Sequence, residues 1–181
     1  GPIMKSGFVA IVGKPNAGKS SLINALLHEK VSIISHKAQT TRNSIIGVLN
    51  SPDYQMVFLD TPGIHKASTI LGSYMNKEAM KQADGVDVIY YLVDAKKGLD
   101  DADKEILEQL FTYNVPVFLL LNKIDLISKD TLMARIIYAH NNYKFKEIIP
   151  ISALCEENLS ELIKTTLNYF NDDIQFYPDD V

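Results

Sequence analysis

The stretch Gly13-Lys14-Pro15-Asn16-Ala17-Gly18-Lys19-Ser20 decides the fold of this chain. An apolar run, residues 8–12, comes before it and predicts a buried strand, and the spacing of the apolar residues after Ser20 predicts a helix. Glycines at two fixed places in a loop let the backbone wrap, so that successive N–H groups point at an anion. The helix adds unpaired N–H groups and the positive end of its dipole. A strand, this loop and a helix in that order predict a phosphate-binding loop.

Two side chains of this loop are expected to act on a bound nucleotide directly. Lys19 would bring a positive charge to the β- and γ-phosphates, and the Ser20 hydroxyl would bind Mg²⁺. The alternative, a glycine-rich turn that arose by chance, is disfavoured because the strand and the helix both lie where the motif requires them. The nucleotide contacts predicted in this part of the chain are Gly13, Lys14, Pro15, Asn16, Ala17, Gly18, Lys19, Ser20 and Ser21.

Length and composition limit what else the chain can be. Its 181 residues predict one domain, and 46% hydrophobic with 22% charged residues is typical of a soluble globular protein. The net charge of −4 gives no electrostatic reason to expect binding to nucleic acid or to anionic lipid. A single cysteine, Cys155, excludes an internal disulfide framework, and no apolar run reaches transmembrane length, so we expect a cytoplasmic protein. We interpret residues 1–3 as a tag remnant, 4–171 as the globular domain and 172–181 as the start of a linker.

Strands alternate with helices along the rest of the sequence. This order predicts an α/β fold of three layers, with a mostly parallel six-stranded sheet, one antiparallel edge strand and helices on both faces. Ligands of such sheets bind at the carboxyl ends of the strands, where every motif described here lies. We expect Ser128 to cap one helix, and Asn158 with Glu161 to form a capping box on the last. The expected strands are 44–50, 54–60, 86–94, 115–122 and 147–151, and the expected helices are 19–28, 75–83, 100–112, 129–141 and 158–170.

The motif Asn122-Lys123-Ile124-Asp125 indicates which base is bound. The carboxylate of Asp125 can accept hydrogen bonds from N1–H and the N2 amino group of guanine, whereas adenine would leave this charge unpaired. The stem of Lys123 can lie across the base, and Asn122 can tie this loop to the phosphate loop. Ser152-Ala153-Leu154 would close the other side, with the N–H of Ala153 near guanine O6. Alone, four such residues are more often a polar loop; after a buried strand and downstream of a phosphate loop, they predict GTP or GDP as the ligand.

The γ-phosphate is expected to meet two further loops. Asp60-Thr61-Pro62-Gly63 follows a strand, where its acid can hold Mg²⁺ through water and the N–H of Gly63 can bond the γ-phosphate. In the long loop 31–43, Thr41 is favoured over Thr40 as a ligand of Mg²⁺ in the GTP state, although an exposed polar role remains open for both. Alone, the first of these motifs would be only a good turn sequence.

Position 64 is informative because it lacks a catalytic side chain. Many GTPases have a glutamine there to orient the attacking water, and Ile64 cannot do this. We therefore expect slow intrinsic hydrolysis that depends on backbone groups, a metal ion or a partner. Asn16 is a candidate ligand for K⁺ bridging the phosphates, with an equal chance that it only shapes the loop. The expected catalytic set is Lys19, Asn16, Thr41 and Gly63, and Ile64 is counted among the nucleotide contacts.

Together these motifs resemble the bacterial Era GTPases, in the group that includes the MnmE and EngA proteins. The segments that carry the resemblance are 13–20, 39–42, 60–65, 71–72, 75–77, 122–125 and 152–154. The resemblance implies a GTP-binding and GTP-hydrolysing switch that acts in 16S rRNA processing and small (30S) ribosomal subunit assembly. A hydrophobic residue at position 64 is typical of this group, and some members bind K⁺ through an asparagine placed like Asn16.

The resemblance also implies partners that this sequence does not by itself explain. Members of the family contact 16S rRNA through a C-terminal KH domain, and no KH-type G-x-x-G loop follows Ser152, so we expect an excised, monomeric G domain. Peripheral association with the inner membrane is implied by family alone. Two alternatives remain open: a nucleotide-gated binding module with negligible hydrolysis, and a related stand-alone GTPase with another target.

Overall fold

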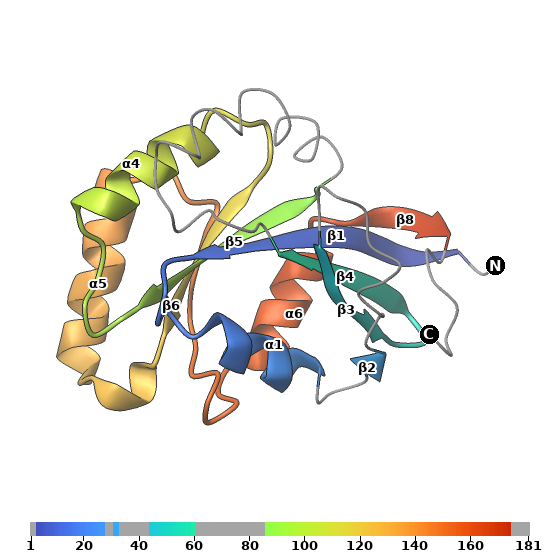
Figure 1. Ribbon diagram of the computed structural model, residues 1–181, viewed down its shortest axis with the longest axis horizontal. Coiled ribbons are helices and arrows are strands. Elements are labelled where there is room, and N and C mark those ends of the chain that lie inside the picture. The colour runs from blue at the N-terminus through green and yellow to red at the C-terminus, as the bar shows by residue number, and fades with distance from the viewer. Residues whose placement is uncertain (1–2, 28–30, 33–43, 61–85, 175–181) are drawn as a thin grey trace.

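The computed structural model describes residues 3–27, 31–32, 44–60 and 86–174, and the description below concerns these ranges (Figure 1). The expected helix at 75–83 and most of the expected loop at 31–43 lie outside them. Among the described residues, no helix has both the length and the apolar character needed to cross a membrane.

A single mixed sheet forms the middle layer. Its strands run in the order β2-β3-β4-β1-β5-β6-β7, and β8 pairs with β1 beside this path. Strands β4, β1, β5, β6 and β7 are parallel, whereas β3 is antiparallel to β4, which confirms the predicted sheet. The short strands β2 and β8 extend it and were not predicted. The bounds are β1 Ile3–Gly13, β2 Val31–Ser32, β3 Ser44–Asn50, β4 Tyr54–Asp60, β5 Val88–Asp94, β6 Val117–Asn122, β7 Glu147–Pro150 and β8 Asn171–Ile174.

Helices cover both faces of the sheet, as predicted. Buried side chains of α1 and α6 pack in one apolar cluster with strand residues, and those of α4 and α5 pack in a second cluster across the sheet. Figure 1 shows α1 and α6 together below the strands, away from α4 and α5. The bounds are α1 Lys19–Leu27, α4 Asp101–Leu110, α5 Lys129–Asn142 and α6 Leu159–Leu167, with a short 3₁₀ helix, η4, at Ile124–Leu126.

The central strand β5 shows why the sheet is buried on both sides. Its sequence is β-branched and aromatic, and successive side chains point to opposite faces. Tyr90 packs with α1 and α6, where its hydroxyl lies 2.6 Å from Oγ1 of Thr166, and Tyr91 packs with α4 and α5. Burial raises the pKa of both tyrosines, so each stays neutral. Both are core residues.

Helix ends follow the predicted capping in one of the two cases. Oγ of Ser128 accepts a hydrogen bond from the Thr131 N–H at 3.1 Å, which confirms the cap of α5. The capping box at the start of α6 is wrong. Asn158 has φ of 66°, makes no side-chain cap, and donates from Nδ2 to the Pro150 carbonyl at 2.8 Å instead. A bridge between Ser152 and Glu157 closes the preceding turn, and Asn158 leaves this turn with a left-handed backbone conformation. Its side-chain amide therefore bonds the end of β7 rather than the first turn of α6.

After α6 the chain returns to the first strand. Residues 171–174 form β8, which pairs in antiparallel fashion with residues 3–6 of β1. Strand β5 pairs with β1 only from residue 9 onward, so it does not reach this part of β1. The buried ring of Phe170 packs over Gly7, where a Cβ atom would lie 2.4 Å from the ring. The first and last described segments are therefore neighbours, as Figure 1 shows.

Candidate nucleotide site

The predicted motifs that the structure describes meet at one edge of the sheet. In the strand register, Ile11 lies beside Asp60, and Asp94 lies beside Asn122. Because β1, β4, β5, β6 and β7 are parallel, the loops that follow them all emerge at their carboxyl ends. The phosphate loop, Asp60, the 122–125 loop and the 152–154 loop therefore surround a common space.

The phosphate loop leads directly from β1 into α1, and Gly18 shows why it needs glycine. Gly18 has φ of 103°, a conformation that side chains strongly disfavour, and a Cβ there would lie 2.3 Å from Nδ2 of Asn122. Asn16 also has a positive φ, 72°, and is exposed. Asparagine tolerates this conformation better than most residues do, which explains its suitability at this place in the loop.

Lys19 and Asp60 form an ion pair at the mouth of the loop. Nζ of Lys19 lies 2.6 Å from Oδ1 of Asp60, and the two side chains are 28% and 32% exposed. Ser20 is exposed in the first turn of α1. Among the described residues there is no group of three or more His, Cys, Asp or Glu side chains that could bind a metal ion. The Ser20 hydroxyl and the Asp60 carboxylate fit Mg²⁺, because this ion typically takes one or two protein oxygens and completes its shell with phosphates and water.

The side chain of Lys14 is paired with two acids at the start of α4. Its Nζ donates to Oδ2 of Asp100 at 2.8 Å and to Oδ2 of Asp103 at 3.1 Å. These two acids also form the capping box of α4, and the fully buried Asp103 accepts a further hydrogen bond from the Tyr91 hydroxyl at 2.5 Å. The hydrogen bond from Lys14 lowers the pKa of Asp100 to about 2. Burial alone would lower the pKa of Lys14, but the two carboxylates outweigh burial and raise it.

Asn122 joins three loops, as its predicted tie to the phosphate loop requires. Its buried side chain donates from Nδ2 to the Ala17 carbonyl at 2.9 Å and accepts from the Ala153 N–H at 3.0 Å. A single amide therefore sets the spacing between the phosphate loop and the two loops expected around the base. Both ends of this amide are satisfied, which favours one fixed arrangement.

Lys123 extends back over the phosphate loop from a left-handed backbone, φ 68°. Its Nζ donates to the Asn16 carbonyl at 2.7 Å and lies 3.3 Å from Oδ2 of Asp94. The outer part of its stem passes Gly18, since Cε would be 3.8 Å from a Cβ placed there. The stem therefore lies beside the phosphate loop.

The carboxylate of Asp125 is exposed and oriented by Ser152. Oγ of Ser152 donates to Oδ1 of Asp125 at 2.8 Å and accepts from the Cys155 N–H at 3.1 Å. With Oδ1 engaged in this way, Oδ2 of the exposed carboxylate keeps its capacity to accept hydrogen bonds. Leu154, 80% exposed, and the exposed Cys155 lie on the rim of the same loop.

A comparison with known protein families identifies this arrangement. The profile of the family described as 50S ribosome-binding GTPase matches residues 8–123, about two thirds of the chain. The chain belongs to this GTPase family.

Within the GTPases, the resemblance to Era is confirmed. GTPase Era of Clostridium kluyveri is 44% identical over 179 residues, which is 99% of this chain and 61% of that protein. A crystal structure of Era with MgGDPNP and nucleotides 1506–1542 of 16S ribosomal RNA superposes with a TM-score of 0.80, at 44% identity, over 98% of this chain and 61% of the other. A crystal structure of an Aquifex aeolicus Era variant bound to GDP·AlF4⁻ superposes with a TM-score of 0.79, at 43% identity, over 98% of this chain and 61% of the other. The chain thus spans about three fifths of the length of these relatives.

Some predicted GTPase residues lie outside the described ranges: Thr40, Thr41, Thr61, Pro62, Gly63 and Ile64. Other residues of the site were missed by sequence reasoning. Asp94 ends a buried strand just as Asp60 and Asn122 do, and this common placement was a usable signal. The partners of Lys14, and the contacts of Arg135 described below, left no such signal because they depend on tertiary packing.

Proposed function

We propose that this chain binds GTP and GDP and hydrolyses GTP to GDP and phosphate, as the G domain of an Era-like switch. The observation that carries the proposal is the Asn122 amide, which connects Ala17 of the phosphate loop to Ala153 of the expected guanine loop. The Asp125–Ser152 hydrogen bond supports the same conclusion, because it presents a fixed carboxylate to N1–H and the N2 amino group of guanine.

Phosphates would compete with Asp60 for Lys19. In the structure the Lys19 ammonium is 2.6 Å from Asp60, so binding of the β- and γ-phosphates exchanges one oxygen partner for another. Ser20 and Asp60 would hold Mg²⁺, with Thr41 rather than Thr40 joining in the GTP state. When bound, this ion neutralises charge on the phosphate oxygens. Released from Lys19, Asp60 is then free to bind the ion or its water.

Hydrolysis joins a water oxygen to the γ-phosphorus and breaks the bond from that phosphorus to the β–γ bridging oxygen. GDP keeps the electron pair, and the protons of the water leave with inorganic phosphate. Ile64 cannot orient the water, so we propose a slow intrinsic rate, with Lys19 and the N–H of Gly63 stabilising charge. We further propose K⁺ as an added ligand of Asn16, whose exposed side chain is compatible with that role.

For the whole protein we propose binding to 16S rRNA and a role in 30S assembly, in the cytoplasm with peripheral membrane contact. The rRNA proposal is supported by the Era structure that contains nucleotides 1506–1542. Contact with RNA would come from a KH domain outside this monomeric G domain, whose sheet includes residues 3–6 and 171–174.

Base selectivity tests the binding proposal. We expect fluorescent GDP to bind this chain and the ADP analogue not to bind. Asp125→Asn should weaken GDP strongly and improve xanthosine diphosphate, because the carboxamide reverses one donor–acceptor pair. An unchanged preference of the variant for GDP over xanthosine diphosphate would show that Asp125 does not read the base.

Single-turnover hydrolysis in K⁺ and in Na⁺ tests the enzymatic proposal. We expect slow phosphate release that is faster in K⁺, with the difference reduced in Asn16→Ala. Nucleotide binding without phosphate release in either salt would favour a nucleotide-gated binding module. Equal rates in both salts, for both proteins, would refute the role of Asn16.

A further inference from the structure

The ammonium of Lys123 has two anchors, and only one belongs to the expected nucleotide contacts. The Asn16 carbonyl accepts a hydrogen bond at 2.7 Å, and the carboxylate of Asp94 lies 3.3 Å away on the neighbouring strand end. Two contacts to the ammonium fix the direction of the long lysine side chain. The rotamer entropy of this side chain is therefore already lost before a nucleotide binds. Whatever holds Asp94 in place therefore also sets the position of the Lys123 stem.

Asp94 is held by a tight turn of its own backbone. Its Oδ1 accepts from the Lys96 N–H at 2.9 Å, and its carbonyl accepts from the N–H groups of Lys97 and Gly98 at 3.0 and 2.9 Å. The Ala95 N–H also donates to the Asn122 carbonyl at 2.9 Å. With Oδ1 engaged in the turn, Oδ2 is directed at Lys123, and the side chain is only 15% exposed.

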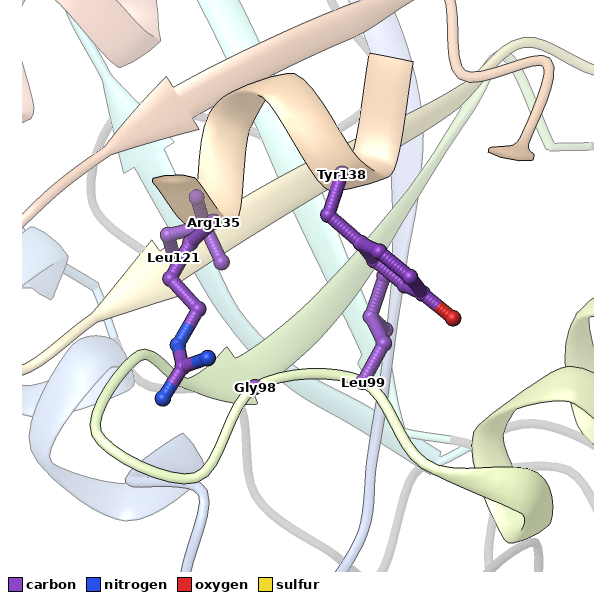
Figure 2. A pocket seen from close by; sticks show the side chains of 5 residues that line it. All are labelled: Gly98, Leu99, Leu121, Arg135 and Tyr138. Carbon is purple, nitrogen blue, oxygen red and sulfur yellow. The ribbon is translucent and has the colours of Figure 1, made fainter. Parts of the chain in front are cut away.

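Arg135 of α5 holds the far side of this turn. Its Nε donates to the Ala95 carbonyl at 2.9 Å and its Nη2 donates to the Lys96 carbonyl at 2.8 Å. Figure 2 shows the side chain extending from the helix down to the turn at Gly98. Gly98 has φ of 76°, and a Cβ there would lie 3.1 Å from Cδ and Nε of Arg135, so glycine favours this close approach.

Two features indicate that this contact has a purpose beyond packing. Between the turn and α5 lies a cavity of about 230 Å³, lined by Gly98, Leu99, Leu121, Arg135 and Tyr138 (Figure 2). In the part of the chain that the structure describes, no carboxylate lies within 4 Å of Arg135. A permanent charge thus serves two backbone carbonyls, and charged donors make the stronger hydrogen bonds.

We propose that Asp94 and Arg135 are positioning residues for the purine platform formed by the stem of Lys123. Arg135 fixes the turn 95–98, the turn fixes the Asp94 carboxylate, and Asp94 fixes the ammonium of Lys123. The proposal rests on the proposed guanine nucleotide function. The proposal deepens that function, because Asp94 and Arg135 would raise the affinity for the flat face of the base without touching the base. Asp125 would separately read the edge of the base.

The rate of fluorescent GDP release from the whole 181-residue chain tests this assignment. Asp94→Asn keeps an acceptor for the turn and removes the charge, and we expect release to be about threefold to tenfold faster, the effect of losing a partly exposed ion pair. Arg135→Ala should accelerate release by about twofold to fivefold, since its effect is indirect. The matched controls Asp53→Asn and Lys129→Ala, both exposed, should leave the rate unchanged.

Two further readouts separate positioning from general destabilisation. In a Lys123→Ala background, Asp94→Asn should no longer change GDP release, whereas damage to the fold would persist there. Asp94→Asn should also weaken GDP and inosine diphosphate by the same factor, because both bases present the same face. An effect of Asp94→Asn that survives in Lys123→Ala, or one confined to GDP, would overturn the proposal.

The test also distinguishes this inference from the function on which it rests. If the wild-type chain failed to bind GDP, the proposed function would be refuted, and the platform role of Lys123 with it. If wild type bound GDP normally and both variants released it at the wild-type rate, only the positioning roles would be refuted.

Discussion

Replacement of Lys14 by methionine should destabilise the nucleotide-free protein by about 2 kcal/mol. Methionine keeps most of the apolar stem and removes only the ammonium, which donates to Asp100 and Asp103. Asp103 is fully buried, and loss of a charged donor to such a group costs about 1.5–3 kcal/mol. Asp100 is 59% exposed, and its pair with Lys14 adds about 1 kcal/mol at most. Asp103 keeps its contacts with Tyr91 and with the Asp100 N–H, so the lower part of this range applies.

Thermal unfolding followed by circular dichroism measures this effect. For a domain of this size, each 1 kcal/mol shifts Tm by about 2–4 °C, so Lys14→Met should lower Tm by about 4–8 °C. Lys104→Met removes an exposed ammonium from α4 and is the matched control, with an expected shift of about 1 °C or less. Lys14→Arg should recover much of the loss because it keeps the charge. Equal Tm values for Lys14→Met and Lys104→Met would refute the reasoning, since the buried Asp103 carboxylate would then gain nothing from the Lys14 ammonium.

Three further predictions follow from the same contacts. Gly18→Ala should weaken GDP by about 100-fold or more, measured by titration, because the new Cβ meets the amide 2.3 Å away and the φ of 103° is strained; near-normal affinity would contradict this. Asp60→Asn should tighten GDP in EDTA, because it frees the lysine for phosphate, and weaken the gain in affinity from Mg²⁺; weaker GDP binding in EDTA would argue against the exchange. The pKa of Asp100 falls from 3.8 to about 2, so its stabilisation is present above pH 4 and lost as pH falls toward 2. Urea unfolding should show that the free energy of unfolding of Asp100→Asn falls less steeply with decreasing pH in this window than that of the wild type. The same dependence on pH in both proteins would contradict the assignment.

Elements with a local cause were predictable from the sequence. The order of strands and helices follows from apolar runs and turn residues, and Ser128 caps α5 because a hydroxyl before a helix needs only its own backbone. The link from Asn122 to the phosphate loop could also be expected, since parallel strands bring their carboxyl ends together. The Ala153 N–H, predicted to lie near guanine O6, donates to Asn122 in this structure.

Features that depend on tertiary packing were not predictable in this way. Asn158 has the residue type of a cap, but the turn before it imposes a left-handed backbone, and the side chain bonds Pro150 instead. Lys14 lies in a phosphate motif, yet its long stem reaches carboxylates that are distant in sequence. The acids near the end of the chain indicated a polar linker, and pairing with β1 is a non-local contact that residue type does not reveal.

Strand β8 also has a consequence for where a fragment of this protein can safely be cut. It supplies the hydrogen-bonding partner for residues 3–6 of β1, beyond the reach of β5. A chain shortened to end at Phe170 would expose those backbone groups as an open edge, and an open edge in the middle of a sheet invites a second molecule to pair with it. Such a fragment should keep its phosphate loop and yet self-associate when it is concentrated. The first sign that β8 has been removed should therefore be aggregation rather than loss of ligand binding.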